Sequence, residues 1–150
     1  MSTIHTPVAS STSTRSPAPI GALVALVASA ATVTGAHNWA EIVITVPVIL
    51  VATGLVFGLV APRALRKESA GGTALGLSIP AVLLLLPAFW AGVPFVLGVA
   101  GVMVGNAGRT ARTGAGACIA GLVLGALAAV GYLAIYASEI AAGNLGFLLD

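Results

Sequence analysis

Charged side chains are scarce in this chain, since only 7% of its 150 residues are Asp, Glu, Lys or Arg. A soluble domain carries about 25% charged residues, so this sequence lacks the polar side chains to cover a water-facing surface. Hydrophobic residues make up 59% of the chain, and we infer that the excess faces lipid. Six basic residues are too few for a nucleic-acid footprint, and their position in loops is better explained by membrane topology.

Residues that support catalysis are also missing. A single cysteine, Cys118, excludes an intramolecular disulfide and a cysteine-based metal site. The sequence contains no Walker motif, no His-Glu-x-x-His and no Gly-x-Ser-x-Gly. Every ionisable residue lies in a loop or at the end of an apolar segment, whereas ion and proton pathways usually carry such residues inside the membrane. We therefore expect no enzyme activity, no cofactor and no metal.

The charged residues leave four long uncharged windows, at 16–40, 42–62, 69–108 and 113–138. A helix of about 20 residues crosses ~30 Å of hydrocarbon. The third window would form a helix of about 60 Å, so it must fold back, and Pro87 and Pro94 bracket the expected turn. The pattern predicts an all-α integral membrane protein with five transmembrane helices, near 18–36, 42–61, 73–89, 93–108 and 115–137.

Two tails flank the predicted transmembrane domain of residues 18–137. Residues 1–17 are rich in Ser, Thr and Pro and are expected to be a disordered cytoplasmic tail, while 138–150 form a short external or interfacial tail. The first apolar segment has a second interpretation, because Ala28-Ser29-Ala30 also fits a signal-peptide cleavage site. A retained span and a cleaved signal peptide both leave residue 37 onward on the same side.

The basic residues predict the orientation. If the N-terminus is cytoplasmic, every Arg and Lys falls on the cytoplasmic side, as the positive-inside rule requires. The topology determinants after the first span are Arg63, Arg66, Lys67, Arg109 and Arg112. Glu41 and Glu139 then fall outside, and we expect a multi-pass protein of the plasma membrane with its N-terminus in the cytoplasm.

The most polar of the outer connections is Ala36-His37-Asn38-Trp39-Ala40-Glu41. His37 and Glu41 are four residues apart and could share a metal, but two ligands make a poor site. We interpret this segment as a loop that caps the second span, with Trp39 at the headgroups. Glu139, close to the end of the fifth span, is interpreted as an interfacial anchor.

The chain contains an internal repeat that predicts two tandem helical hairpins in spans two to five. Pro47, Leu50, Gly54 and Gly58 match Pro94, Leu97, Gly101 and Gly105 at an offset of 47, and Arg63 and Arg66 match Arg109 and Arg112 at 46. Small residues four apart let membrane helices approach closely. The candidate packing residues are Gly54, Gly58, Gly101, Gly105, Gly121 and Gly125, and they serve contacts either within one chain or between chains.

The segment Gly108-Arg109-Thr110-Ala111-Arg112-Thr113-Gly114-Ala115-Gly116, which runs on to Ala120-Gly121-Leu122-Val123-Leu124-Gly125, resembles a known family. It is similar to the small multi-pass membrane domains of unknown function that are common in actinobacteria. That family has an apolar hairpin, a loop like G-R-x-x-R-x-G-x-G, and A-G-x-x-L-G at the start of another span. The resemblance covers roughly residues 73–132 and implies a bacterial membrane location and topology, without an activity or a substrate.

From the residues and the resemblance together we expect a non-enzymatic packing or interaction component of the cell envelope. Its partners are the lipid bilayer and further copies of the chain, with no nucleic acid and no protein partner that the sequence identifies. The alternative is a small transporter or channel subunit. Its polar pathway would form between protomers and use Thr53, Ser78 or Asn106.

The predicted topology can be tested by cysteine accessibility in a Cys118→Ser background. A membrane-impermeant thiol reagent added outside should modify Asn38→Cys, because residue 38 is expected in an outer loop. It should not modify Glu68→Cys or Thr110→Cys, which are expected in the cytoplasm. External labelling at residue 68 would contradict the orientation.

Overall fold

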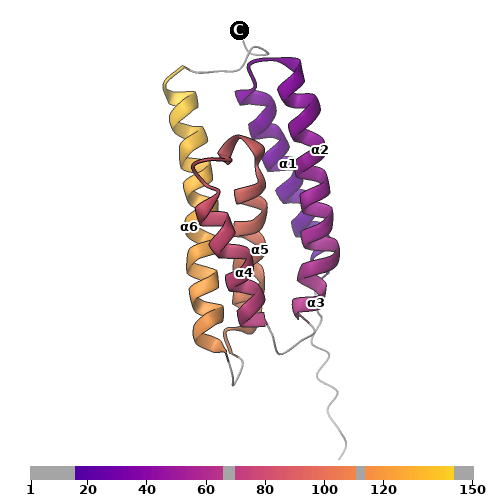
Figure 1. Ribbon diagram of the computed structural model, residues 1–150, viewed down its shortest axis with the longest axis vertical. Coiled ribbons are helices and arrows are strands. Elements are labelled where there is room, and N and C mark those ends of the chain that lie inside the picture. Colours follow the sequence, from indigo (N-terminus) through magenta and orange to yellow (C-terminus); the bar gives the residue numbers. More distant parts are fainter. Residues whose placement is uncertain (1–15, 66–69, 111–113, 144–150) are drawn as a thin grey trace, which may run out of the picture.

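The computed structural model describes residues 16–65, 70–110 and 114–143, and every regular element in these ranges is a helix (Figure 1). The prediction of an all-helical fold is therefore confirmed for this part of the chain. Most of the predicted tail at 1–17 lies outside the described residues, as does the chain beyond Gly143. Four of the six basic residues on which the topology prediction rests also lie outside them, namely Arg15, Arg66, Lys67 and Arg112.

Seven helices and one π-helical turn follow one another along the described chain. They are α1 (Ala18–Gly35), α2 (Trp39–Leu55), the π-helix η1 (Val56–Val60), α3 (Ala61–Leu65), α4 (Ala70–Leu83), the 3₁₀ helix η2 (Phe89–Ala91), α5 (Val93–Gly108) and α6 (Ala115–Ala141). Because α2, η1 and α3 continue into one another, they form a single long rod.

Three of these helices are long and apolar enough to cross a membrane: α1, the rod Trp39–Leu65 and α6. The other two large helices are shorter, since α4 has 14 residues and α5 has 16. At about 1.5 Å per residue they rise about 21 and 24 Å. The helix expected over 73–89 ends at Leu83 and is followed by a turn. Pro87 explains this early end, because it has no amide hydrogen to donate to the Leu83 carbonyl and its ring would collide with that carbonyl in a continued helix.

The helices pack in two groups that meet at α5 (Figure 1). Helices α4, α5 and α6 pack closely against one another, and α1 pairs with the rod that begins with α2. Helix α5 touches both groups and is buried over most of its length. The apolar core accordingly includes residues from both groups, among them Val24, Ala28, Ile49, Phe57, Ala74, Val96, Ala100, Val104 and Tyr132.

Ser78 and three glycines form the closest contact between α4, α5 and α6. The Ser78 hydroxyl is fully buried and donates a hydrogen bond of 2.6 Å to the Gly121 carbonyl oxygen. A Cβ atom at Gly101 would overlap Ser78 Oγ, and one at Gly125 would lie 3.0 Å from it. The absence of side chains at these positions is thus what allows the three backbones to meet around one serine.

A second close contact lies further along the same helices. A Cβ atom at Gly105 would lie 2.5 Å from the Cys118 carbonyl oxygen and 2.9 Å from the Leu122 amide nitrogen. A Cβ atom at Gly121 would lie 2.6 Å from the Cβ of Ala74. These neighbours are largely backbone, which cannot rotate away. Gly101, Gly105, Gly121 and Gly125 therefore all lie at contacts within the chain.

The two remaining candidate glycines have different surroundings. Gly54 and Gly58 are exposed, and a Cβ atom at either would meet nothing within 4 Å. In addition, α4 packs against α5 and α6 rather than against α2. Positions that match in the internal repeat thus lie in unlike environments, and the two copies do not form equivalent hairpins in the described chain.

The π-helical turn η1 lies directly before Pro62. Proline lacks an amide hydrogen, and its ring collides with the carbonyl four residues earlier in a regular helix. In the wider turn the Ala61 amide instead donates to the Val56 carbonyl, five residues back. The Arg63 guanidinium adds a hydrogen bond of 3.0 Å to the Leu59 carbonyl. The turn lets the rod continue past a proline without breaking.

A matched pair of alanine substitutions tests the glycine contacts. Gly105→Ala should lower the free energy of unfolding in detergent by about 1–3 kcal/mol, because the added methyl group meets backbone atoms. Gly58→Ala, at the matching position of the repeat, should leave it unchanged. Thermal unfolding of the two purified variants measures the difference. Equal stability of the two variants would refute the close contact at Gly105.

Candidate functional site

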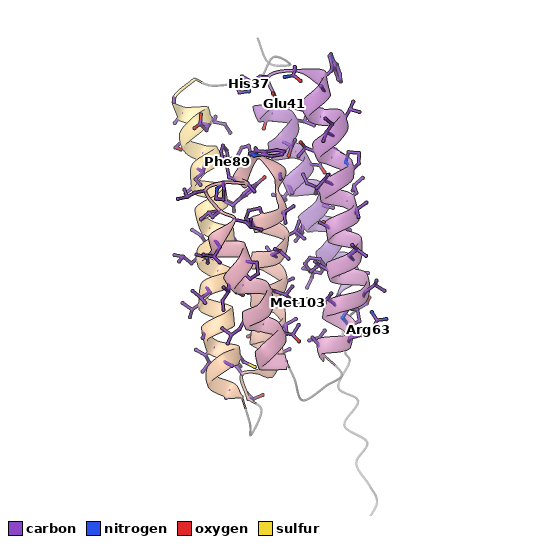
Figure 2. All side chains as sticks on the ribbon, in the orientation of Figure 1. His37, Glu41, Arg63, Phe89 and Met103 are labelled. Carbon is purple, nitrogen blue, oxygen red and sulfur yellow. The ribbon has the colours of Figure 1, made fainter. Side chains whose placement is uncertain are left out.

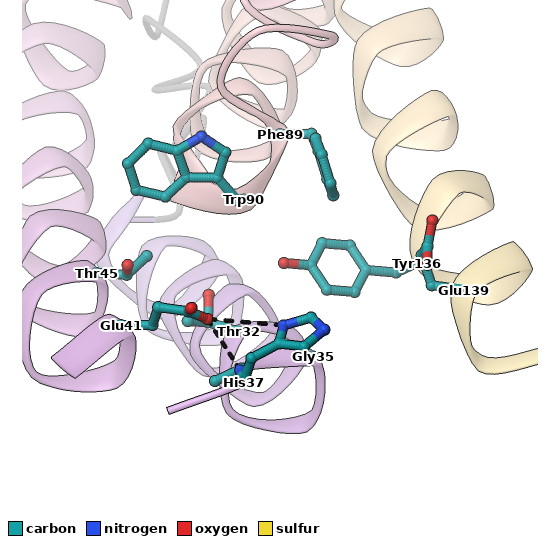
Figure 3. A pocket seen from close by; sticks show the side chains of 10 residues that line it. Thr32, Gly35, His37, Glu41, Thr45, Phe89, Trp90, Tyr136 and Glu139 are labelled. Carbon is teal, nitrogen blue, oxygen red and sulfur yellow. Dashed lines mark hydrogen bonds and ion pairs between the residues drawn. The ribbon is translucent and has the colours of Figure 1, made fainter. Parts of the chain in front are cut away.

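A cavity of about 360 Å³ lies at one end of the bundle, where α1, α2 and α6 extend beyond the turn that joins α4 to α5 (Figures 1 and 3). It arises because the α4–α5 hairpin is shorter than the helices around it. Its lining combines polar and aromatic side chains: Thr32, Gly35, Ala36, His37, Glu41, Thr45, Phe89, Trp90, Tyr136 and Glu139. Pockets of about 300–1,000 Å³ are typical of small-molecule sites.

The rim of the cavity is ordered by the start of α2. Asn38 is the N-cap residue, and its side-chain oxygen accepts a hydrogen bond of 3.0 Å from the Glu41 amide. In return, Glu41 Oε1 accepts from Asn38 Nδ2 at 2.8 Å and Glu41 Oε2 accepts from the His37 amide at 2.9 Å. This arrangement is close to a capping box. The predicted capping role of the loop is confirmed.

His37 and Glu41 approach each other as their spacing suggested. His37 Nδ1 lies 3.9 Å from Glu41 Oε2, and both side chains are solvent-accessible (Figure 3). Among the described residues no group of three His, Cys, Asp or Glu side chains is placed to hold a metal ion. We interpret the pair as part of the rim of the cavity, which both residues line.

An aromatic series leads from the cavity into the core. Phe89 and Tyr136 meet edge to face with ring centroids 6.1 Å apart. Tyr136 lies 4.9 Å from Tyr132, which stacks on Phe95 at 5.2 Å. Tyr132 is fully buried. The aromatic wall thus continues below the cavity as a packed column.

The bottom of the cavity is closed by the turn between α4 and α5. Gly92 has a φ of +67°, and a Cβ atom there would lie 2.8 Å from Ile49 Cδ1 and 3.4 Å from the Cβ of Ala28. The turn therefore presses directly on α1 and α2. Below it lie buried apolar side chains such as Val96 and Ala100. The cavity is consequently blind at this end.

The charges of the described chain are separated between its two ends (Figure 2). Glu41 and Glu139 line the cavity, and no Lys or Arg is among the lining residues. Arg63 lies in α3, at the opposite end of the rod from Glu41, and Arg109 directly follows α5. The cavity therefore lies at the acidic end of the molecule.

The residues proposed for a pathway between protomers lie in different places. Thr53 and Ser78 are buried inside the chain, so they do not reach a surface that a second protomer could contact. Asn106 is exposed near the end of α5. The structure does not bring these three residues together.

Several lining residues went unrecognised in the sequence. Thr32, Thr45, Phe89 and Tyr136 come from four separate segments, and no local motif links them. A partial signal existed in Tyr132 and Tyr136, which place two hydroxyl-bearing rings four residues apart on one face of a span. The sequence does single out His37 and Glu41 as a spaced pair in the loop that caps the second span, and Glu139 as an interfacial anchor.

The chain matches no protein-family model, no curated protein and no solved structure. The resemblance to the actinobacterial membrane domains therefore stays a prediction. What the fold defines is a helical protein with three helices that can cross a membrane.

The cap at Asn38 can be tested by substitution. Asn38→Ala removes the acceptor for the Glu41 amide and should lower the free energy of unfolding by about 1 kcal/mol. Asn38→Ser keeps an acceptor and should lose much less. Thermal unfolding in detergent distinguishes the two variants. An alanine variant as stable as the original chain would mean that the rim is not held by this cap.

Proposed function

We propose that this chain is a multi-pass integral membrane protein of the bacterial plasma membrane that binds a small molecule in its blind cavity, without catalysing a reaction. The observation that carries the proposal is the cavity itself. It gathers a cluster of polar and aromatic side chains from four segments in a bundle that is otherwise apolar. Concave sites with a few convergent polar groups are the usual form of a ligand pocket.

The membrane arrangement supports this function. The three long helices cross the bilayer, and α4 and α5 form the remaining two of five spans as a hairpin that turns before the outer surface. Their rises of about 21 and 24 Å fall short of the ~30 Å hydrocarbon thickness. Non-helical backbone at membrane depth is tolerated where it is buried in protein or lines a water-filled cavity, and the turn at 84–92 lies below such a cavity.

The orientation is proposed from the charges. Because both ends of the α4–α5 hairpin lie on the same side, the positive-inside argument is unaffected by its shortness. It places Arg63 and Arg109 in the cytoplasm with the N-terminus, and opens the cavity to the outside. Helix α1 supplies Val24 and Ala28 to the core, which supports a retained first span rather than a cleaved signal peptide.

Association with other proteins in the envelope is part of the proposal. Gly54 and Gly58 leave a strip without side chains on the exposed face of the rod. We propose that a second copy or another membrane protein contacts the chain there. Transport is the second candidate. Because Thr53 and Ser78 are buried within the chain, a pathway between protomers has little support, and binding without transport is favoured.

Trp90 provides a test of binding. It lines the cavity, and Trp39→Phe leaves it as the sole tryptophan of the chain, which has two. Three probes of similar size should be titrated in nanodiscs: benzyltrimethylammonium, phenylacetate and benzyl alcohol. At least one should change the Trp90 emission saturably, because a ring in the cavity alters the indole's surroundings.

A matched pair of variants tells cavity binding from partition into lipid. Thr45→Phe places a ring in the cavity and should abolish the saturable change. Val43→Phe, on the exposed face of the same helix, should preserve it. If none of the three probes gives a saturable change, the proposed function is wrong.

A further inference from the structure

We infer that the ligand of this cavity is an organic cation, a protonated or quaternary amine that carries an apolar group about the size of a benzyl ring. This inference rests on the proposed binding function and adds the chemical class of the ligand. Three properties of the lining lead to it: the sign of its charge, the position of its rings, and the closed apolar floor.

The charge of the lining favours a positive ligand. Glu41 and Glu139 both line the cavity, on α2 and α6, and His37 is the one lining residue that can carry positive charge. Two carboxylates therefore outweigh the imidazole even when it is protonated. Arg63 and Arg109 lie at the far end of the molecule. An anion in the cavity would face carboxylates with no described basic side chain except His37.

Glu41 keeps capacity for a ligand although it takes part in the cap. Its two oxygens accept one hydrogen bond each from Asn38 Nδ2 and the His37 amide. An ionised carboxylate offers about four acceptor sites, so those two bonds leave lone pairs and the negative charge in place. The cap also holds the carboxylate at the rim, which lowers the entropy lost when a cation is bound.

The rings favour an organic cation over a metal ion. Phe89, Trp90 and Tyr136 all line the cavity (Figure 3), and Phe89 and Tyr136 meet edge to face. Aromatic faces attract cations through the ring quadrupole and commonly surround quaternary ammonium groups. A bare metal ion would need several ligands at once, and the described residues hold no group of three His, Cys, Asp or Glu side chains placed to bind one.

The closed floor favours an apolar group on the ligand. Trp90 and Phe89 belong to the short helix η2 that precedes Gly92, and the turn seals against Ile49 and Ala28. Thr45 lines the cavity and is only 3% exposed. The ligand's apolar group therefore fits against Phe89 and Trp90 of η2, and its charged group lies beside the Tyr136 ring, toward the carboxylates at the rim.

A comparison of the binding of charged and uncharged probes tests the ligand class. In the Trp39→Phe chain in nanodiscs, benzyltrimethylammonium should change the Trp90 emission saturably. Neopentylbenzene replaces its nitrogen by carbon and keeps the shape, and it should bind at least about tenfold more weakly, since it lacks the attraction to two carboxylates. Phenylacetate should not bind.

Three substitutions separate the contributions to binding. Glu139→Gln should weaken benzyltrimethylammonium about tenfold and leave neopentylbenzene unchanged. Tyr136→Leu should weaken the cation about fivefold, because a ring face is lost. Tyr136→Phe keeps the ring and should bind within about twofold of the original chain.

The outcomes distinguish this inference from the proposed function. If benzyl alcohol, neopentylbenzene or phenylacetate binds in the cavity as tightly as the cation, the chain binds small molecules and the inferred ligand class is wrong. The same conclusion follows if Glu139→Gln affects the cation and its carbon isostere alike. If no probe binds, the proposed function itself fails.

Discussion

Close backbone contact between α4, α5 and α6 is the constraint on which the rest of the structure depends. In lipid, apolar side chains gain little by meeting one another, so helices associate through van der Waals packing and a few hydrogen bonds. Here the glycines at 101, 105, 121 and 125 allow that packing, and the bond from Ser78 to the Gly121 carbonyl joins α4 to α6 at its centre. A side chain at any of these positions would separate the helices.

The same packing determines where the cavity lies. The close packing of α4, α5 and α6 fixes the position of the α4–α5 hairpin. The turn of this hairpin reaches only part of the way along the longer helices around it. Gly92 then brings the turn into contact with Ala28 of α1 and Ile49 of α2. Helices α1 and α2 are therefore held against the α4–α5 hairpin at this level. Above the turn, side chains of α1, α2 and α6 line the cavity. The site is thus a consequence of unequal helix lengths.

The sequence was informative about the helical fold and about local capping, and poor in tertiary information. The scarcity of charge and the long apolar windows suffice to predict a helical fold, and the polar loop at 36–41 predicts the cap that the structure shows. Glycine spacing cannot distinguish an inward face from an outward one, so Gly58 and Gly105 looked alike although they differ in surroundings. The cavity lining is assembled from four segments, and such convergence leaves no periodic pattern to read.

The π-helical turn gives a physical meaning to an irregularity in the internal repeat. The two copies align at an offset of 47 up to Gly58 and at 46 from Arg63, so the first copy has one residue more in this interval. In a regular helix an added residue would rotate everything after it by about 100°. A turn with bonds five residues apart absorbs that residue locally. The rod thus accommodates one extra residue within Val56–Val60, and it keeps buried residues both before the turn, at Thr53, and after it, at Ala64.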